Sequence, residues 1–205
     1  MSYDPAARLR ELSPDLPDAT FERVVDFAAT LVKWNRRFSF TSMPDGDVVD
    51  RLIAPSVWLG ARYGEEFSGI TVADFGTGVG IPGLVMGLVD EKNRYSLIDS
   101  AGKKISFIRQ FVATRGLTDR VAVEECRWRP EMTEGRGIDR VVSRAAGSIS
   151  EVTALFPGVS SFDFFKGGDA GEEMAAFAAT SPDASATLLT APDWFGDLRV
   201  VRVRG

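Results

Sequence analysis

A glycine-rich loop that begins with an acid is the first feature of this sequence that could do chemistry. The segment DFGTGVGIPG, residues 74–83, holds Asp74 and then four glycines within eight positions, directly after the apolar run ITVA. Glycine in a regular element costs about 0.5–1 kcal/mol relative to alanine, so such a cluster needs a reason. Gly76, Gly78 and Gly80 would let the backbone turn tightly and approach a ligand closely. We therefore expect a nucleotide-type ligand here, rather than an ordinary strand-to-helix turn.

Two acids at the ends of successive strands narrow the choice of ligand. The segment from Gly78 to Gly83 matches the dinucleotide pattern G-x-G-x-x-G, which is weak evidence alone. Asp74 suits a cationic amine, such as that of S-adenosylmethionine, better than a pyrophosphate. Asp99 ends the next expected strand, RYSLID, and can accept hydrogen bonds from the ribose hydroxyls of NAD or of S-adenosylmethionine. From these acids alone, both cofactors remain open.

The N-terminal part of the chain shows helical patterns. One helix is expected from about Ala19, with Asp18 as its N-cap, because apolar side chains then recur at helical spacing. A second helix is expected from about Asp47 to Tyr63, and Pro55 should kink or interrupt it.

From Ile70 onwards, apolar strands and helices alternate, which predicts an α/β fold with a parallel sheet wrapped by helices. The last two strands, ATLLTAP and LRVVRVR, are joined by PDWFGD, which is too short for a crossover helix. They should pair antiparallel at or near the end of the sheet, which is a trait of methyltransferase sheets rather than dehydrogenase sheets. We expect an N-terminal helical region over 1–64 and a Rossmann-like domain over 65–205, forming one integrated unit.

Composition excludes several kinds of site. The 205 residues contain no histidine and one cysteine, so we expect no metal site and no imidazole base. The N-terminus is polar and no apolar run reaches the length of a membrane helix, so a cytoplasmic protein without membrane association is expected. The net charge of −5 argues against a generic nucleic-acid binder but leaves room for a local basic patch.

Several segments, in order, carry a resemblance to a known family. They are LVKWNRRFSFTS (31–42), DFGTGVGIPG, LIDSAGKKISFIRQ (97–110), DRVVSRA (139–145) and FKG (165–167). The chain resembles a divergent member of the glucose-inhibited division protein B family, the RsmG-type methyltransferases that form 7-methylguanosine in bacterial 16S ribosomal RNA. The resemblance implies a seven-stranded Rossmann-like class I S-adenosylmethionine-dependent sheet. It also implies S-adenosyl-L-methionine as cofactor and, as partner, 16S rRNA or a small ribosomal subunit precursor, bound by a monomer.

The resemblance also assigns roles to residues. Arg144 and Lys166 are the expected catalytic residues. A backbone stretch near the adenine is expected after an arginine of the third-strand region, for which Arg127 is the best match. The expected cofactor-binding residues are Asp74, Gly76, Thr77, Gly78, Gly80, Ile81, Asp99, Ser100, Arg127, Trp128, Arg129 and Arg144.

The substrate side departs from the family. Where the family usually has Arg-His-Ile-Leu-Asp-Ser, this chain has Arg-Leu-Ile-Ala-Pro-Ser at 51–56. Where the family has Asn-Leu-Thr, this chain has Ser-Phe-Thr at 39–41. Three alternatives therefore stay open beside the leading hypothesis. These are a methyltransferase with a different substrate, a catalytically silent RNA-binding or ribosome-assembly protein, and, more distantly, an NAD oxidoreductase.

Methylation of guanine N7 is chemistry that a chain without histidine can perform. N7 carries a lone pair and no proton, so attack on a sulfonium methyl needs no general base, whereas methylation of a hydroxyl does. Catalysis can rest on holding the reacting atoms about 3–3.5 Å apart. Arg144 could donate to guanine O6 or to a phosphate, or form a salt bridge with Asp139 or a nearby glutamate. Lys166 should face the same crevice, or be a solvated lysine.

Basic residues at two helix ends are further candidates. Lys103 and Lys104 begin a helix, where the helix dipole disfavours cations by about 0.3–1 kcal/mol, so they either bind phosphate or occupy a solvated end. The basic run from Lys33 to Arg37 closes the first long helix, where the dipole favours cations, and RNA contact is the other reading. Trp34 in this run could stack on a base, but its apolar neighbours favour packing.

Overall fold

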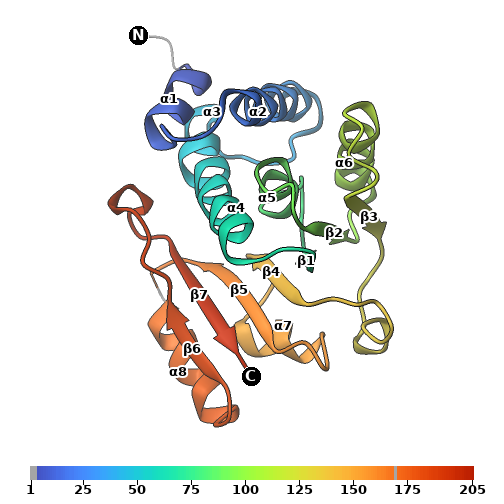
Figure 1. The fold of residues 1–205 in the computed structure, drawn as a ribbon, viewed down its shortest axis with the longest axis vertical. Coiled ribbons are helices and arrows are strands. Elements are labelled where there is room, and N and C mark those ends of the chain that lie inside the picture. Colours follow the sequence, from blue (N-terminus) through green and yellow to red (C-terminus); the bar gives the residue numbers. More distant parts are fainter. Residues whose placement is uncertain (1–3, 169) are drawn as a thin grey trace.

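A seven-stranded sheet forms the centre of the computed structural model, which describes residues 4–168 and 170–205 (Figure 1). The strand order is β3-β2-β1-β4-β5-β7-β6. Strands β1 to β5 are parallel, and β7 is antiparallel to both β5 and β6. This arrangement confirms the predicted α/β sheet and its C-terminal antiparallel hairpin. The strands are β1 Thr71–Phe75, β2 Arg94–Asp99, β3 Val121–Glu125, β4 Arg140–Arg144, β5 Ser161–Lys166, β6 Ser185–Leu188 and β7 Arg199–Arg204.

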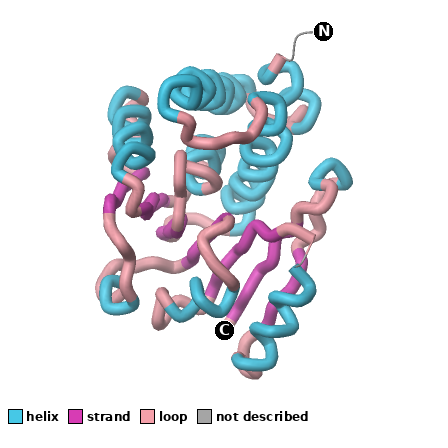
Figure 2. The backbone as a smooth tube through the Cα atoms, turned by 180° about the vertical axis from the view of Figure 1, so that it is seen from behind, coloured by secondary structure: helices cyan, strands magenta, loops and turns pink. Residues whose placement is uncertain are grey.

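Helices cover both faces of the sheet. On one face lie α4 (Ala54–Glu66), α5 (Gly83–Val89) and α6 (Gly102–Thr114), with α1 (Pro5–Leu12) and α2 (Asp18–Phe38) stacked outside them. On the other face lie α7 (Ile149–Ala154) and α8 (Ala170–Thr180). Both views show α1, α2, α4 and α5 on one side of the molecule and α7 and α8 on the other (Figures 1 and 2). Short helical turns complete the chain: α3 Asp45–Asp47, η1 Val48–Ile53, η2 Pro130–Met132 and η3 Asp193–Phe195.

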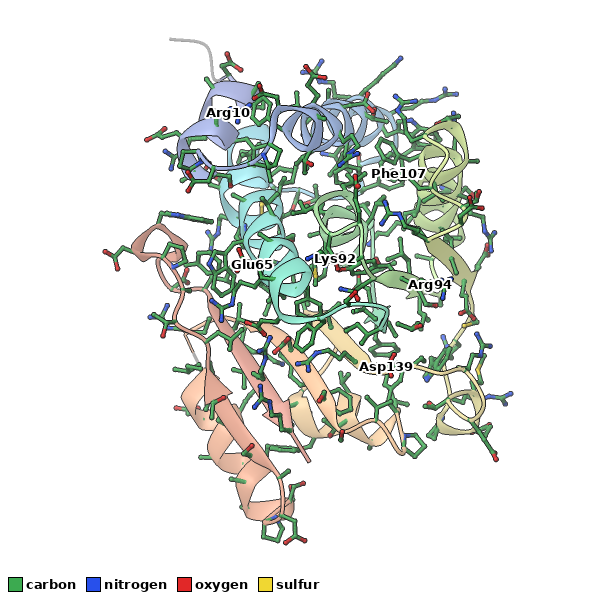
Figure 3. The ribbon with its side chains drawn as sticks, viewed as in Figure 1. Arg10, Glu65, Lys92, Arg94, Phe107 and Asp139 are labelled. Carbon is green, nitrogen blue, oxygen red and sulfur yellow. The ribbon has the colours of Figure 1, made fainter. Side chains whose placement is uncertain are left out.

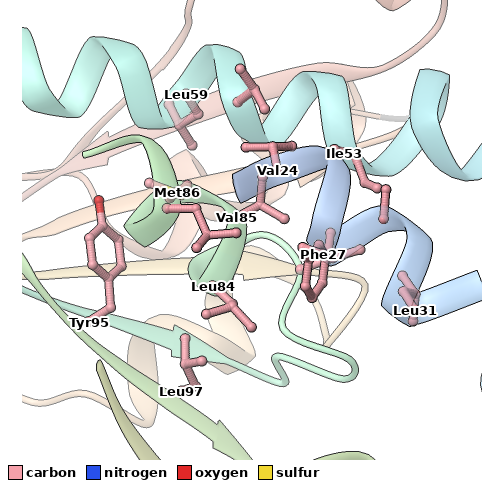
Figure 4. Close-up of a cluster of buried hydrophobic side chains, with 14 of the residues drawn as sticks. Val24, Phe27, Leu31, Ile53, Leu59, Leu84, Val85, Met86, Tyr95 and Leu97 are labelled. Carbon is pink, nitrogen blue, oxygen red and sulfur yellow. The ribbon is translucent and has the colours of Figure 1, made fainter. Parts of the chain in front are cut away.

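The alternation of side chains along each strand separates two buried apolar clusters. Val72 and Val142 face the cluster beneath α4, α5 and α6, whereas their neighbours Ala73 and Val141 face the cluster beneath α7 and α8. Figure 4 shows part of the first cluster, where Phe27 of α2 lies among side chains of the other helices. The helices that precede the sheet therefore share one core with it.

The N-terminal helices differ from the predicted ones at their boundaries. Helix α2 begins at Asp18 itself, so the N-cap position is occupied by Pro17, whose side chain has no acceptor, and the predicted Asp18 cap is wrong. The Asp18 carboxylate accepts a hydrogen bond from Arg10 (2.8 Å). Helix α1 lies within the expected helical region, although its bounds were not predicted; Asp4 caps it by accepting hydrogen bonds from two main-chain N–H groups of its first turn.

The predicted second helix is divided into three segments, and proline explains the division. Directly before Pro55 the chain forms the π-helical segment η1, in which the N–H of Ala54 donates to the carbonyl of Val49. Proline has no N–H for the carbonyl four residues earlier and its ring would clash there, so the wider turn relieves the contact. Pro55 then lies in the first turn of α4, where no N–H is needed.

A buried ionic network ties α4 to the sheet. Asp163 of β5 accepts hydrogen bonds from Tyr63 Oη (2.6 Å), Arg202 Nε (2.8 Å) and Arg140 Nη2 (3.3 Å). Burial, followed by the negative charge of Asp163, raises the pKa of Tyr63 well above its ordinary value. Along the part of the chain that the structure describes, no helix combines the length and apolarity needed to cross a membrane.

Candidate functional site

The carboxyl ends of β1, β2, β4 and β5 bring the predicted site residues to one edge of the sheet. Because these strands are parallel and their registers align, the glycine loop after β1 lies beside Asp99 at the end of β2. Arg144 ends β4 on the other side of β1, and Lys166 ends β5. Ligands of open α/β sheets bind at this edge.

The glycine loop adopts backbone conformations that side chains disfavour. Gly76, Gly78 and Gly80 have φ of 71°, 58° and 91°, in the left-handed region that favours glycine. A Cβ on Gly76 would lie 2.4 Å from the Cβ of Ala146, so this glycine permits contact between the loops after β1 and β4. A Cβ on Gly78 would meet nothing closer than 4.0 Å, which leaves open space in front of the loop. The loop is thus tightly folded, and no side chain covers its backbone at Gly78.

Asp74 supports this loop from behind. Its side chain is fully buried, and Oδ2 accepts hydrogen bonds from the Thr77 hydroxyl (2.5 Å) and the Gly83 N–H (2.7 Å). Among the described residues, Oδ1 has no hydrogen-bond partner. Burial raises the pKa of the Asp74 carboxyl to about 7, although its two hydrogen bonds oppose the shift. Asp74 therefore holds the loop in shape, a role that its position before the glycines did not reveal.

Asp99 connects the loop to α6. Its Oδ2 accepts from the Gly78 N–H (2.8 Å) and its Oδ1 from the Ala101 N–H (2.8 Å). The side chain is half-buried, and Ser100 beside it is exposed. The carboxylate thus lies at the edge of the glycine loop. There the hydroxyl groups of a ligand could replace the Gly78 N–H as hydrogen-bond donors to Asp99.

Thr77 and Ile81 are buried within the loop and contribute to its packing. Their main-chain groups are joined by a hydrogen bond from the Ile81 N–H to the Thr77 carbonyl (3.0 Å). Pro82 precedes α5, which begins at Gly83.

The segment after β3 places its three predicted residues differently. Arg127 and Arg129 are exposed, and Arg129 forms an ion pair with Glu131 (3.2 Å). The Trp128 side chain is buried, stacks on Phe156 with ring centroids 5.2 Å apart, and donates a hydrogen bond from Nε1 to the Leu155 carbonyl. Its ring is therefore committed to the core, and the segment offers its main chain and two guanidinium groups to the surface.

A cleft of about 880 Å³ opens at the ends of β4 and β5, and both predicted catalytic residues line it. Arg144 forms no ion pair with any described residue, neither Asp139 nor a glutamate, and its Nη1 is buried without a hydrogen-bond partner. Burial, followed by the positive charge of Arg51, lowers the pKa of Arg144 to about 10. A half-buried cation with an unpartnered Nη1, repelled by a second cation, is suited to binding an anion or a strong acceptor.

Lys166 is held in place at the bottom of this cleft. Its Nζ donates to the Gly147 carbonyl (2.7 Å) and forms an ion pair with Glu173 (2.7 Å), and the residue is 8% exposed. Lys166 is therefore a fixed and partnered cation, rather than a solvated lysine.

Sequence reasoning missed other walls of the cleft. Arg51 of η1 lines it, as does the turn from Trp194 to Leu198 between β6 and β7. Only contact with β4 and β5 places these segments at the site, so no local signal could have marked them. Leu52 and Pro55, two positions that depart from the family pattern, do not line the cleft. Within residues 4–168 and 170–205, no group of three or more His, Cys, Asp or Glu could hold a metal ion.

The sequence comparison decides the family. A family model described as GidB, rRNA small subunit methyltransferase G, matches residues 20–180. The chain belongs to this family. It is 30% identical over 199 residues to the ribosomal RNA small subunit methyltransferase G of Aeromonas hydrophila, covering 92% of this chain and 88% of that relative. The relative of the same name from Methylococcus capsulatus is 35% identical over 151 residues, covering 70% of this chain and 68% of the relative.

Solved structures support the same fold for this GidB-family chain. A human methyltransferase 10 domain containing protein superposes with a TM-score of 0.56 at 13% identity, covering 87% of this chain and 94% of that one. The M. capricolum TrmK, solved in complex with S-adenosyl-homocysteine, gives a TM-score of 0.53 at 12% identity, covering 72% and 67%. At these identities the likeness concerns the fold alone, which is the Rossmann-like methyltransferase fold predicted from the sequence.

Proposed function

We propose that this chain transfers the methyl group of S-adenosylmethionine to N7 of a guanosine in 16S ribosomal RNA. The observation that carries the proposal is the Arg144 guanidinium, whose buried Nη1 has no hydrogen-bond partner, in a large cleft near the glycine loop of a chain of this family. The substrate would be naked 16S RNA or a small-subunit precursor, met in the cytoplasm by a monomer.

The loop and its acids fit this cofactor. The open space in front of Gly78 accommodates a ligand, and the Asp99 carboxylate at its rim suits ribose hydroxyls. Oδ1 of Asp74, which has no hydrogen-bond partner among the described residues, would accept from a cationic amine, and the charge of that amine would favour the ionised carboxylate. We propose that Gly76, Gly80, Thr77, Ile81 and Ser100 shape this pocket and that the backbone of 127–129 borders the adenine.

The residues of the cleft would position the base. When bound, S-adenosylmethionine supplies an electrophilic methyl group. Arg144 donates to guanine O6 or to the adjacent phosphate and so orients N7 towards the cofactor loop. Lys166, fixed by Glu173 and Gly147, would act as a hydrogen-bond donor in the wall of the cleft. N7 has no proton to lose, so the residues need only hold it in line and exclude water.

Methyl transfer to undermethylated RNA tests the proposal. The purified chain is incubated with labelled S-adenosylmethionine and either 16S RNA or small subunits from cells that lack this activity, and nucleosides are analysed by mass spectrometry. Label in 7-methylguanosine is the expected result. Label on another atom, or no transfer by a protein that calorimetry shows to bind the cofactor, would overturn the assignment.

A further inference from the structure

Two stretches without acids, far apart in the sequence, contribute to one surface. Residues 27–44 and 100–118 contain no Asp or Glu, although the chain has a net charge of −5. The first stretch carries Lys33, Arg36 and Arg37, and the second begins with Lys103 and Lys104. Four of these five side chains are exposed, and Lys104 is half-buried.

The antiparallel packing of α2 and α6 brings these cations together. Arg115, just after α6, forms an ion pair with Asp26 in the first half of α2 (2.6 Å). Further along, Trp34 of α2 packs on Phe107 of α6, with ring centroids 5.3 Å apart, and Figure 3 labels Phe107 at this contact. The C-terminal end of α2 therefore lies beside the N-terminal end of α6.

An aromatic ladder lies at the same end of α2. Phe40 stacks on Trp34 (interplanar angle 16°) and on Phe38 (17°), and the outermost ring, Phe38, is 38% exposed. Ser39 between the two phenylalanines has φ of 51°, which is unusual for a residue with a side chain and reverses the chain so that both rings meet. An exposed, supported aromatic ring beside several cations is the combination that binds unpaired bases and their phosphates.

We propose that this surface, formed by Lys33, Arg37, Phe38, Phe40, Lys103 and Lys104, binds a single-stranded segment of RNA next to the target guanosine. The inference rests on the proposed function for its substrate class. No described carboxylate forms an ion pair with Lys33, Arg37, Lys103 or Lys104, so their charge is available to phosphates. The positive end of the α6 dipole adds to this potential.

The position of the surface fits a segment that continues from the cleft. Helix α6 begins at Gly102, and Asp99, just before it, bonds to Gly78 of the proposed cofactor loop. Phe38 can stack on a base only if that base is unpaired, because the bases of a duplex stack on one another. A single strand or a loop is therefore the expected partner, and a duplex of equal length is not.

Fluorescence anisotropy with a labelled 12-nucleotide single-stranded RNA, and with a blunt-ended RNA duplex of the same length, tests this inference independently of methyl transfer. Wild type should prefer the single strand. Phe38→Leu keeps an apolar side chain but loses the aromatic face, and should weaken binding by about 5- to 100-fold, whereas Phe38→Tyr should retain it. Lys103→Gln with Lys104→Gln should reduce the slope of log affinity against log salt by about 1.4, as expected for two phosphates on a single strand.

A matched control removes the same charge from the same helical stretch. Arg109→Gln with Arg115→Gln breaks existing ion pairs with Glu125 and Asp26, and should leave RNA affinity within about twofold. Cofactor affinity by calorimetry and the thermal unfolding midpoint should be unchanged in the Phe38 and Lys103/Lys104 variants. Equal effects of both charge pairs, equal binding of the duplex, or no loss with Phe38→Leu would overturn the inference.

Different results would show that the RNA-binding surface is wrong and that the proposed function is wrong. If wild type forms 7-methylguanosine but Phe38→Leu binds single-stranded RNA as wild type does, the surface is wrong and the function stands. If the variants lose RNA binding but wild type forms no 7-methylguanosine, the surface stands and the function is wrong. If the variants bind naked RNA as wild type does and lose only their binding to whole small ribosomal subunits, the partner is not an RNA strand and the inference fails.

Discussion

At the scale of single residues, the buried carboxyl of Asp74 makes stability depend on pH. Its pKa in the folded protein is about 7, above the ordinary value of 3.8, so the folded state holds the proton more tightly. The stabilisation is fully present below about pH 3.8 and is lost as the pH rises to about 7. When the pH rises from 5 to 8, the free energy of unfolding of wild type should fall by about 1–3 kcal/mol more than that of Asp74→Asn. Urea unfolding at both pH values measures this, and parallel losses in the two proteins would contradict it.

Arg144 is the second residue whose environment makes a prediction. Its guanidinium is repelled by Arg51 and is not paired with any described carboxylate, so Arg144→Gln should leave the free energy of unfolding unchanged or slightly higher. Methyl transfer at saturating cofactor should nevertheless fall by about 10²-fold, as on loss of one preorganised donor. Denaturant titration and initial rates measure the two effects. Arg62→Gln, which removes an α4 cation paired with Glu66, is the control for charge.

At the scale of elements, the glycine loop separates strain from ligand contact. Gly76→Ala should destabilise the fold, because its new methyl group would lie 2.4 Å from Ala146. Gly78→Ala should cost only about 1–2 kcal/mol for its left-handed backbone, yet weaken cofactor binding at least tenfold, since its methyl group fills the space in front of the loop. Gly158 also has a positive φ (83°) and open space around it, and it lies away from the site. Gly158→Ala is therefore a control that introduces similar backbone strain without affecting the site. Calorimetry should find unchanged cofactor affinity in that control; a similar loss there would refute the placement of the site.

The strands and the final hairpin could be predicted, because alternation, turn residues and connection lengths are local signals. The placement of the site residues at one edge followed from parallel strands alone. The π-helical segment before Pro55 and the inward position of Asp74 could not, because they rest on local geometry that the residue types alone do not specify. The burial of the Trp128 ring could not, because it depends on packing between distant segments. The pairing of α2 with α6, which gathers two basic runs, was hidden for the same reason.

At the scale of the whole molecule, the network around Asp163 joins the N-terminal helices to β4, β5 and β7. Asp163→Asn would leave the buried guanidinium of Arg140 without its counter-charge and that of Arg202 with Glu66 alone. We expect a loss of about 3–5 kcal/mol in the free energy of unfolding. Asp119→Asn, an exposed carboxylate just before β3, should change it by less than about 0.5 kcal/mol. A loss below 1 kcal/mol in chemical denaturation of the Asp163 variant would show that the network does not stabilise the fold.

The division into 1–64 and 65–205 stays a prediction, with the proposal that the two parts fold as one unit. Val24, Phe27 and Ile53 of the N-terminal helices are buried in the same cluster as Val72 and Leu84 of the sheet domain. A fragment of residues 65–205 should therefore show no cooperative thermal transition, and adding a peptide of residues 1–64 should restore one. Cooperative unfolding of the isolated fragment would show two independent domains.

The strand order has a consequence for how the chain reaches this shape. Strand β6 precedes β7 in the sequence, yet β7 lies between β6 and β5 and is the neighbour with which β6 pairs. During folding, β6 can join the sheet only together with β7 or after it. Until then the side of β5 that faces β7 exposes unpaired N–H and C=O groups. The rate at which the last hairpin docks thus sets how long that open edge can recruit another chain, and with it the tendency to aggregate before folding is complete.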